Sequence, residues 1–336
     1  MVAMAADAAA ETATMTAVVR RRYGSPDVLE LAEVEKPELV DDGVLVRVRA
    51  SSVNRADWYG LTGTPYLARP MMGGLRRPKS ALFGGDFAGI VEAVGRDVTD
   101  LQPGDEVFGG RTGAFAEYVC VRNGVARKPA NLSFEEAAAV PVAALTALQG
   151  LRDRGRLQPG QHVLVNGASG GVGTFAVQIA KALGAEVTAV CSTRNVELVR
   201  SLGADQVVDY TREDFTRSGR RYDLLLDVAG SKPWSACRRV LQPNATLVIV
   251  GAPKGSRLLG PLGHIARMRL ASLSGSQKAV FFIADFNRPD MAALRELVES
   301  GKVKPVVEKR YELSELADAL RYMGEGHVQG KLVVSV

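Results

Sequence analysis

The sequence predicts an α/β protein with two domains, a β-rich, barrel-like domain and a doubly wound domain built on a parallel sheet. Two observations carry this prediction. From residue 16 to about 125, short alternating segments such as VLVRVRASSV (44–53) are separated by dense Gly/Pro punctuation, which is typical of a barrel. After Ser133, continuous apolar strands alternate with amphipathic helices, which is typical of a parallel sheet covered on both faces.

The composition is that of a globular protein and argues against two classes of function. Hydrophobic residues make up 46% of the 336 residues, yet no apolar run reaches the roughly 18 residues that a membrane helix needs. The net charge of +5 is small for this length and the basic residues are scattered. We therefore expect neither a membrane nor a nucleic acid as a partner.

The cysteines and the first residues predict a cytoplasmic protein. Cys120, Cys191 and Cys237 lie far apart and form no CxxC pair, so neither disulfides nor a structural zinc site is expected. Residues 1–14 are rich in alanine and contain no Arg or Lys, unlike a signal or transit peptide. We expect a disordered tail over 1–14.

The second half of the chain alternates strand and helix patterns. Ser133 and Glu136 have the spacing of a capping box at the start of a helix, which Pro141 should kink or break. The patterns that follow are HVLVN, GTFAVQIAKALG, EVTAVC, NVELVRSLG, QVVDY, YDLLLDVAG, a helix near 233–240 and TLVIVGAP. The C-terminal segment adds a helix, a strand, a helix and a strand: MAALRELVES, VVEKRYEL, SELADALRYM and KLVVSV.

The stretch GASGGVG (167–173) has the context of a dinucleotide-binding turn, because it follows a strand and opens a helix. Its glycines fit two spacings, that of short-chain dehydrogenases and a GxGxxG pattern with alanine first. Short-chain enzymes also need a Tyr-x-x-x-Lys pair, and none of the eight tyrosines has lysine four residues later. The second spacing remains, and it places the pyrophosphate against Ala168, Ser169, Gly170, Gly171, Val172 and Gly173.

The residues after the second strand of this domain predict NADPH rather than NADH. An acidic residue about 20 positions after the turn would bind a ribose 2′-hydroxyl. Here the stretch is CSTRNVELVR, with no acid before Glu197 and with Arg194 at the tip. Arginine pairs well with a phosphate, and Ser192 and Thr193 can add hydroxyl donors.

At this point a family resemblance becomes visible. GQHVLVNGASGGVGTFAVQIAK (160–181) resembles the turn of quinone oxidoreductases, the zinc-independent, ζ-crystallin-like branch of the medium-chain dehydrogenase/reductase superfamily. Further blocks resemble the family in the same order: SVNRADWYGLTG, GGDFAGIVEAVG, LQPGDEVFG, GAFAEYV, PVAALTALQGL and GKLVV. The resemblance covers nearly the whole chain from residue 16.

The resemblance implies a GroES-like catalytic domain and a Rossmann cofactor domain. The catalytic domain is then split in sequence, with a first part over 15–134 and a second part over 285–336. The NADPH-binding Rossmann domain occupies 135–284. The family tends to form homodimers through a sheet edge, which here would lie near QKAVFFIA (277–284).

Site residues follow from the same resemblance. Asn54 and Tyr59 would lie beside the nicotinamide and Thr146 under its ring, with Tyr59 either donating to the acceptor oxygen or only packing. Tyr210 and Arg194 would flank the 2′-phosphate, although the family often has lysine at the position of Asn195. The turn after the last apolar strand (Val250, Gly251 and Ala252) would pass near the nicotinamide, and Lys331 would contact the cofactor.

The residue types at the superfamily's metal positions predict a metal-free site. Zinc alcohol dehydrogenases place cysteine where Asn54 stands, and a His-Glu pair where Gly85 and Asp86 stand. The histidines of the chain have no ligand spacing, and the lobe of four cysteines is missing. Without a Lewis acid, conjugated acceptors are favoured, because the charge left by hydride addition spreads over their π-system. Asp57 and Asp86 are interpreted as structural carboxylates.

The sequence therefore predicts NADPH-dependent hydride transfer to a quinone or an α,β-unsaturated carbonyl. Two alternatives remain open. An enoyl-thioester reductase would use a basic groove for its phosphorylated carrier, and the cluster Arg76, Arg77 and Lys79 could serve that. A non-catalytic NADPH-binding structural protein is the other alternative, against which Asn54, Tyr59 and Thr146 argue.

Overall fold

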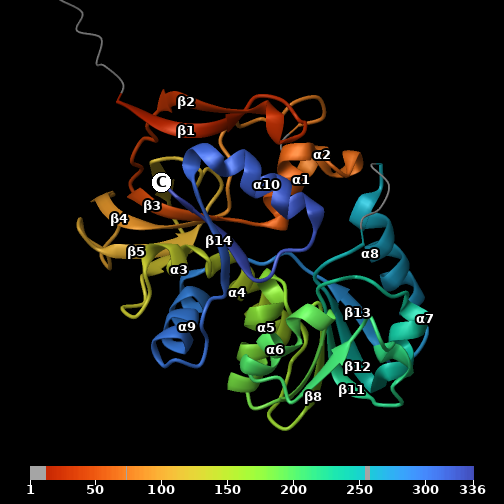
Figure 1. Cartoon of the computed structure of the whole chain (residues 1–336). Helices are drawn as coiled ribbons and strands as arrows, with labels where there is room; N and C mark the ends of the chain where they lie inside the picture. The colour runs from red at the N-terminus through yellow and green to blue at the C-terminus, as the bar shows by residue number, and fades with distance from the viewer. Residues whose placement is uncertain (1–12, 73, 254–257) are drawn as a thin grey trace, which may run out of the picture.

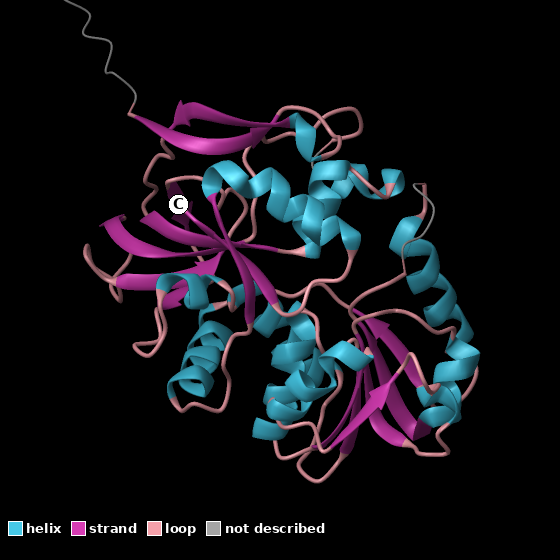
Figure 2. Ribbon diagram, in the orientation of Figure 1, coloured by secondary structure: helices cyan, strands magenta, loops and turns pink. Residues whose placement is uncertain are grey.

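The computed structural model describes residues 13–72, 74–253 and 258–336, so the tail expected over 1–14 falls almost entirely outside the described residues. Figure 1 and Figure 2 show two groups of strands with helices between and around them, and a separate two-stranded ribbon above the first group. This ribbon pairs β1 (Thr14–Arg20) with β2 (Leu29–Glu35) in antiparallel fashion. None of the described helices combines the length and the apolar character needed to cross a bilayer.

The first group of strands is the β-rich domain that the sequence predicted. Its sheet has the order β14-β15-β3-β4-β5-β7, with β6 also pairing with β3. These strands are β3 (Val44–Val53), β4 (Asp86–Val94), β5 (Glu106–Gly110), β6 (Tyr118–Val121), β7 (Val125–Arg127), β14 (Val307–Glu312) and β15 (Lys331–Ser335). The C-terminal β15 pairs with β3 over Leu332–Ser335, so the end of the chain completes a sheet begun nearly 300 residues earlier.

Strand β3 is only partly the half-buried strand that its alternation predicted. Arg47 and Arg49 are exposed on either side of the buried Val48, but every residue from Ala50 to Val53 is buried. Ser51 and Ser52 are tolerated there because both hydroxyls donate hydrogen bonds to Asp86, at the start of the neighbouring β4. The helices of this domain are α1 (Arg55–Thr62), α2 (Arg69–Met72), α9 (Arg288–Glu299) and α10 (Leu316–Glu325).

The second group is a parallel sheet with the order β10-β9-β8-β11-β12-β13, as predicted for a doubly wound domain. Its strands are β8 (His162–Asn166), β9 (Glu186–Cys191), β10 (Gln206–Asp209), β11 (Tyr222–Asp227), β12 (Leu241–Ile249) and β13 (Lys278–Phe281). Val163 and Val165 pack with α5 (Gly171–Ala182) and α6 (Val196–Ser201) on one face. Leu164 packs with α7 (Trp234–Cys237) and α8 (Gly260–Ala271) on the other, so both faces are covered.

The capping box predicted at Ser133 is confirmed. The Ser133 hydroxyl accepts from the Glu136 amide, and the Glu136 carboxylate accepts from the Ser133 amide. The helix it starts is short, because α3 (Phe134–Ala138) ends before Pro141, the first residue of α4 (Pro141–Gln149). A π-helical turn (Gly150–Arg154) follows α4.

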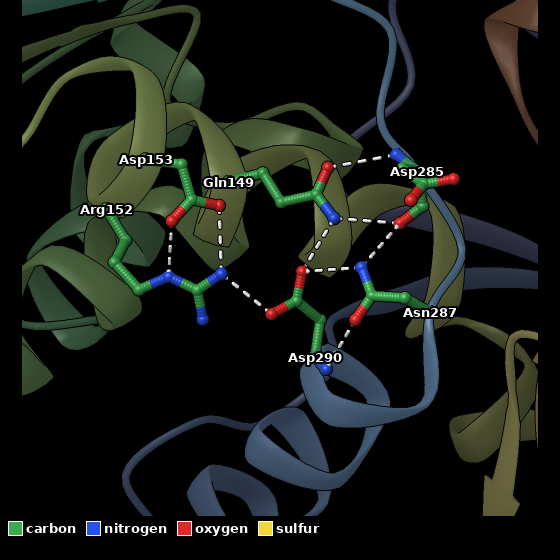
Figure 3. Close-up of polar contacts among 6 residues, drawn as sticks. All are labelled: Gln149, Arg152, Asp153, Asp285, Asn287 and Asp290. Atoms are coloured by element: carbon green, nitrogen blue, oxygen red, sulfur yellow. Dashed lines mark hydrogen bonds and ion pairs between the residues drawn. The ribbon is translucent and has the colours of Figure 1, made fainter.

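A polar network fixes the place where the chain leaves the parallel sheet for the β-rich domain (Figure 3). The Gln149 side chain donates to the Asp285 carbonyl and to Asp290, and accepts from the Asp285 amide. Arg152 donates to the other oxygen of Asp290 at 2.7 Å, while Asn287 caps α9. The end of α4 thereby anchors the returning segment at 285–290, next to the domain boundary that the sequence suggested.

Candidate active site

The glycine-rich turn lies between β8 and the amino end of α5, and at Gly173 its backbone leaves no room for a side chain. A Cβ added to Gly173 would lie 2.1 Å from the Gly167 carbonyl oxygen. At Gly170, the N-cap of α5, an added Cβ would meet nothing nearer than 3.7 Å, so this part of the turn is open. The first amides of α5 lack acceptors within the helix. This arrangement fits the pyrophosphate of a dinucleotide.

The other predicted cofactor residues follow the carboxyl ends of neighbouring parallel strands, which meet at one edge of the sheet. Ser192, Thr193 and Arg194 follow β9, and Tyr210 follows β10 with 61% of its surface exposed. Val250, Gly251 and Ala252 follow β12 and are half-buried, with the Val250 and Gly251 amides bound to the Asp227 carbonyl. The structure therefore brings the predicted cofactor segments together beside the glycine-rich turn.

At the end of β9, Arg194 and Asn195 occupy different environments. Arg194 is exposed at the tip and donates a hydrogen bond to the His327 carbonyl of the β-rich domain. Asn195 is buried, and its amide donates to the hydroxyls of Ser169 (2.8 Å) and Ser192 (3.2 Å). The Arg194 side chain is thus exposed at this edge and bonded to the β-rich domain, while Asn195 holds the glycine-rich turn to the loop after β9.

In the β-rich domain, Asp86 is the centre of a buried polar cluster. One carboxylate oxygen accepts from Ser52 Oγ at 2.6 Å and from Asn54 Nδ2 at 2.8 Å. The other accepts from the Val142 amide in the first turn of α4, at 2.8 Å. Sequence reasoning gave Asp86 a structural role, and the structure adds that it joins β3, β4 and α4 beneath Asn54. The sequence could have indicated this role, because Asp86 is a charged residue at the first position of an otherwise mostly apolar strand.

Lys331 completes this cluster. Its side chain is only 2% exposed, and its ammonium donates to Asn54 Oδ1 (2.5 Å), Asp86 Oδ2 (3.2 Å) and the Val53 carbonyl (3.3 Å). Its aliphatic part lies against α5, since a Cβ on Gly171 would be 3.1 Å from Lys331 Cδ. The adjacent Gly330 amide donates to the Ser169 carbonyl of the glycine-rich turn at 2.8 Å. The C-terminal segment therefore connects the cofactor turn to the Asn54 cluster.

The remaining predicted catalytic residues border this cluster on α1 and α4. Tyr59 is half-buried, burial raises the pKa of its hydroxyl, and that hydroxyl has no hydrogen-bond partner among the described residues. The Thr146 hydroxyl donates to the Val142 carbonyl, one turn earlier in α4. Asp57 accepts from the Asn54 amide, and burial raises its pKa to about 7. Asp57 thus fixes the start of α1, while the Tyr59 hydroxyl is left available.

Sequence reasoning missed a second buried cluster, at the ends of β8 and β11. Asn166 Nδ2 donates to Asp227 Oδ1 at 2.7 Å, and the Gly230 amide donates to the same oxygen at 2.8 Å. Asp227 Oδ2 has no partner among the described residues, and burial raises the pKa of this carboxyl to about 6. Both residues lie where the strand order reverses between β8 and β11, which is the usual ligand position in such sheets. A polar residue ending each apolar strand was the signal that could have revealed them.

Comparison with known proteins agrees with this architecture. The family model for the alcohol dehydrogenase GroES-like domain matches residues 40–130, and that for a zinc-binding dehydrogenase matches 202–334. The mouse mitochondrial NAD(P)H oxidoreductase RTN4IP1 is 34% identical over 97% of this chain and 90% of its own length. The Arabidopsis thaliana chloroplastic NADPH-dependent alkenal/one oxidoreductase is 33% identical over 95% of this chain and 79% of its own.

A solved structure agrees as well. The quinone oxidoreductase from Coxiella burnetii is 30% identical and superimposes with a TM-score of 0.83, over 96% of this chain and 100% of the other. The predicted fold, a GroES-like domain joined to a Rossmann domain, is therefore confirmed, and the chain is an oxidoreductase that uses a nicotinamide cofactor. The chain belongs to the quinone oxidoreductase branch of the medium-chain dehydrogenase/reductase superfamily.

Proposed function

We propose that this protein transfers hydride from NADPH to a quinone or an α,β-unsaturated carbonyl without a metal ion. The observation that carries the proposal is the junction at Gly330 and Lys331. The Gly330 amide donates to the Ser169 carbonyl of the glycine-rich turn, and the side chain of the next residue, Lys331, donates to Asn54. With its pyrophosphate at the turn, NADPH would supply hydride from a nicotinamide lying near Asn54, and the residues of the β-rich domain would position the acceptor.

The choice of NADPH is supported by the end of β9. Arg194 is exposed and suits a 2′-phosphate, with the hydroxyls of Ser192 and Thr193 beside it. The Thr193 hydroxyl donates its proton to Asp209, so it would have to turn away from this carboxylate to donate to the phosphate. The Arabidopsis thaliana relative is named an NADPH-dependent oxidoreductase. The turn residues Ala168 to Gly173, the Val250–Ala252 turn, Tyr210 and Lys331 are proposed as the remaining cofactor contacts.

Tyr59 is proposed as the donor to the acceptor oxygen. Its hydroxyl has no hydrogen-bond partner among the described residues, so its proton is available to an acceptor oxygen. Burial raises its pKa, which keeps the phenol neutral and makes it a weaker acid. Asn54 is held by Asp86 and Lys331 and so presents a fixed carboxamide beside the site. Thr146 projects from the second turn of α4, whose first turn is fixed by Asp86.

Metal independence is supported by the chemistry of the residues at the superfamily's metal positions. Asn54 is a poor zinc ligand, and Asp86 is already neutralised by the Lys331 ammonium at 3.2 Å. Across residues 13–72, 74–253 and 258–336, no three His, Cys, Asp or Glu side chains converge as metal ligands would.

The test is NADPH consumption measured with a quinone, an enone, an enoyl thioester and a simple aldehyde, each with a chelator, with added zinc and with neither. We expect turnover of the quinone or the enone that the chelator does not change. Turnover of the aldehyde only with added zinc would refute the proposal, and preferred turnover of the thioester would support the enoyl-thioester reductase instead. Tight NADPH binding with no turnover of any acceptor would favour a non-catalytic protein.

The role of Tyr59 has its own test. Tyr59→Phe should lower kcat for the enone by about 10²-fold, since general-acid donation contributes that order. Tyr118→Phe, a half-buried tyrosine on β6, is the matched control and should leave kcat unchanged. Equal kcat values for the two variants would reduce Tyr59 to a packing residue.

Three further proposals concern organisation. A catalytic domain over 15–134 and 285–336, with a cofactor domain over 135–284 between them, is supported by the pairing of β15 with β3.

A homodimer through the β13 edge is supported by the position of β13 at the end of its sheet and by the exposed Ile283. Light scattering should then give twice the chain mass, and Ile283→Asp should give the monomer. A cytoplasmic location is supported by three free, buried cysteines, and cell fractionation tests it.

A further inference from the structure

A basic hollow lies on the β-rich domain, where the end of β1 meets the segment before β4. It has a volume of about 510 Å³, is open to solvent, and is lined by Arg20, Arg21, Gly74, Arg77, Pro78, Lys79 and Ala81. The Arg20 amide donates to the Ala81 carbonyl at 2.9 Å, which holds the two walls together. Four of these seven residues are cationic and none is acidic, so the hollow is suited to an anion.

Arg20 forms the inner wall, and its side chain is in an unusual state for a buried charge. The residue is only 6% exposed, and its Nε and Nη1 atoms are buried without any hydrogen-bond acceptor. The guanidinium lies over the Phe83 ring, 5.1 Å from its centroid, and Nη1 would be 3.1 Å from a Cβ on Gly60. A buried cation without acceptors destabilises the folded protein. Nε and Nη1 are closed to solvent, so Nη2 is the nitrogen that a ligand in the hollow would reach.

The carboxylates near the hollow leave its positive charge largely uncompensated. Arg77 and Lys79 are exposed and make no ion pair within the described part of the chain. Arg21 pairs with Glu30 at 3.5 Å, but both side chains are more than half exposed, so the pair is weak. Asp57 interacts with Arg20 electrostatically and is committed to the Asn54 amide.

We propose that this hollow binds a phosphate group, as inorganic phosphate or as the monoester of a small molecule, through Arg20, Arg77 and Lys79. A phosphate dianion carries acceptors in several directions and could be shared by a buried guanidinium and two flexible surface cations. Gly60 lies close to Arg20 Nη1, one residue after Tyr59, so the Arg20 side chain packs against α1, the helix that carries the proposed donor. The proposal does not depend on the identity of the hydride acceptor.

The test uses the full chain saturated with NADPH, so that the phosphate site of the cofactor is already filled. Isothermal titration with inorganic phosphate should show binding that Arg77→Ala/Lys79→Ala weakens at least about tenfold. The matched control is Arg238→Ala/Arg239→Ala, at a second basic hollow that also includes Arg221. The control should leave the affinity unchanged. Equal losses in both double variants, or no binding to the wild type, would overturn the proposal.

Arg20→Met provides an independent arm. It should abolish phosphate binding, and without phosphate its Tm should equal or exceed that of the wild type, because an unpaired buried charge has been removed. A lower Tm with phosphate binding retained would make Arg20 a structural residue and would contradict the proposal. If Arg20→Met does not fold, the exposed double variant still carries the test.

Coenzyme A and dephospho-coenzyme A distinguish the two sources of phosphate, since they differ only in the 3′-phosphate monoester. Tighter binding of coenzyme A, lost in Arg77→Ala/Lys79→Ala, would identify a monoester ligand. Binding of inorganic phosphate with no difference between the two coenzymes would identify free phosphate. Binding of dephospho-coenzyme A alone would contradict both forms of the proposal.

Discussion

Replacing Lys331 with methionine isolates the contribution of the buried ammonium while keeping the aliphatic part of the side chain. The change removes three hydrogen bonds, one of which is the 3.2 Å ion pair to Asp86, and the two charged side chains are 2% and 0% exposed. Losing one partner of a buried pair costs roughly 3–5 kcal/mol of folding free energy. Asp86 keeps donors from Ser52, Asn54 and Val142, so we expect the lower end, about 3 kcal/mol. At roughly 2.1 cal/mol/K of unfolding entropy per residue, this corresponds to a fall in Tm of about 4 °C for a chain of 336 residues.

The measurement is thermal and urea unfolding of Lys331→Met beside Lys302→Met, an exposed lysine whose replacement should change stability by less than about 0.5 kcal/mol. The double variant Lys331→Met/Asp86→Asn removes both charges. It should be more stable than the sum of the single changes by about 1–3 kcal/mol, because the two side chains interact directly. Equal stability of Lys331→Met and Lys302→Met, or strict additivity in the double variant, would refute the assignment of a stabilising buried pair.

Three further predictions concern Asp57, Arg194 and the glycine-rich turn. Burial raises the pKa of Asp57 from 3.8 to about 7, so its contribution to stability is present below pH 4 and lost as pH rises through 7. Asp57→Asn cannot ionise, so its stability relative to the wild type should increase across this range. Urea unfolding at pH 8 should show a gain of up to about 4 kcal/mol. Arg194→Met should raise KM for NADPH about tenfold and leave KM for NADH unchanged, and a loss confined to NADH would contradict NADPH preference. Gly173→Ala must displace the Gly167 carbonyl and should cost about 1–3 kcal/mol of folding free energy, whereas Gly170→Ala should be tolerated. A Tm of Gly173→Ala equal to that of the wild type would show that the backbone of the turn can move to accept a side chain.

Much of the fold and of the cofactor side could be predicted because the signals are local. The turn at 167–173 combines strand, glycines and helix within about fifteen residues, and the structure has β8, the turn and α5 in that order. The capping box at Ser133 and the interruption at Pro141 depend only on neighbouring residues. Parallel strands place their carboxyl ends at one edge, so the residues after β9, β10 and β12 had to lie near the turn. Their individual contacts with the cofactor remain predictions.

The Asn54 cluster could be expected only in part. The resemblance pointed to Asn54 and Lys331 separately, but the Lys331 ammonium reaches Asp86 across 245 positions of the sequence. No periodicity encodes that contact, because it exists only after β15 has paired with β3. The same holds for Asn166 and Asp227, which meet because β8 and β11 are neighbours in the sheet.

The sequence by itself determined the two kinds of domain, the dinucleotide turn and the absence of the superfamily's zinc ligands, because each is written in residues close together or in a recognisable block. The tertiary structure alone decided which charges lose contact with water. Arg20 is one of three consecutive arginines, and only the packing of Phe83 and Gly60 against it makes it the buried one without an acceptor. Burial depends on distant segments, and it is burial that turns an ordinary arginine or lysine into a site.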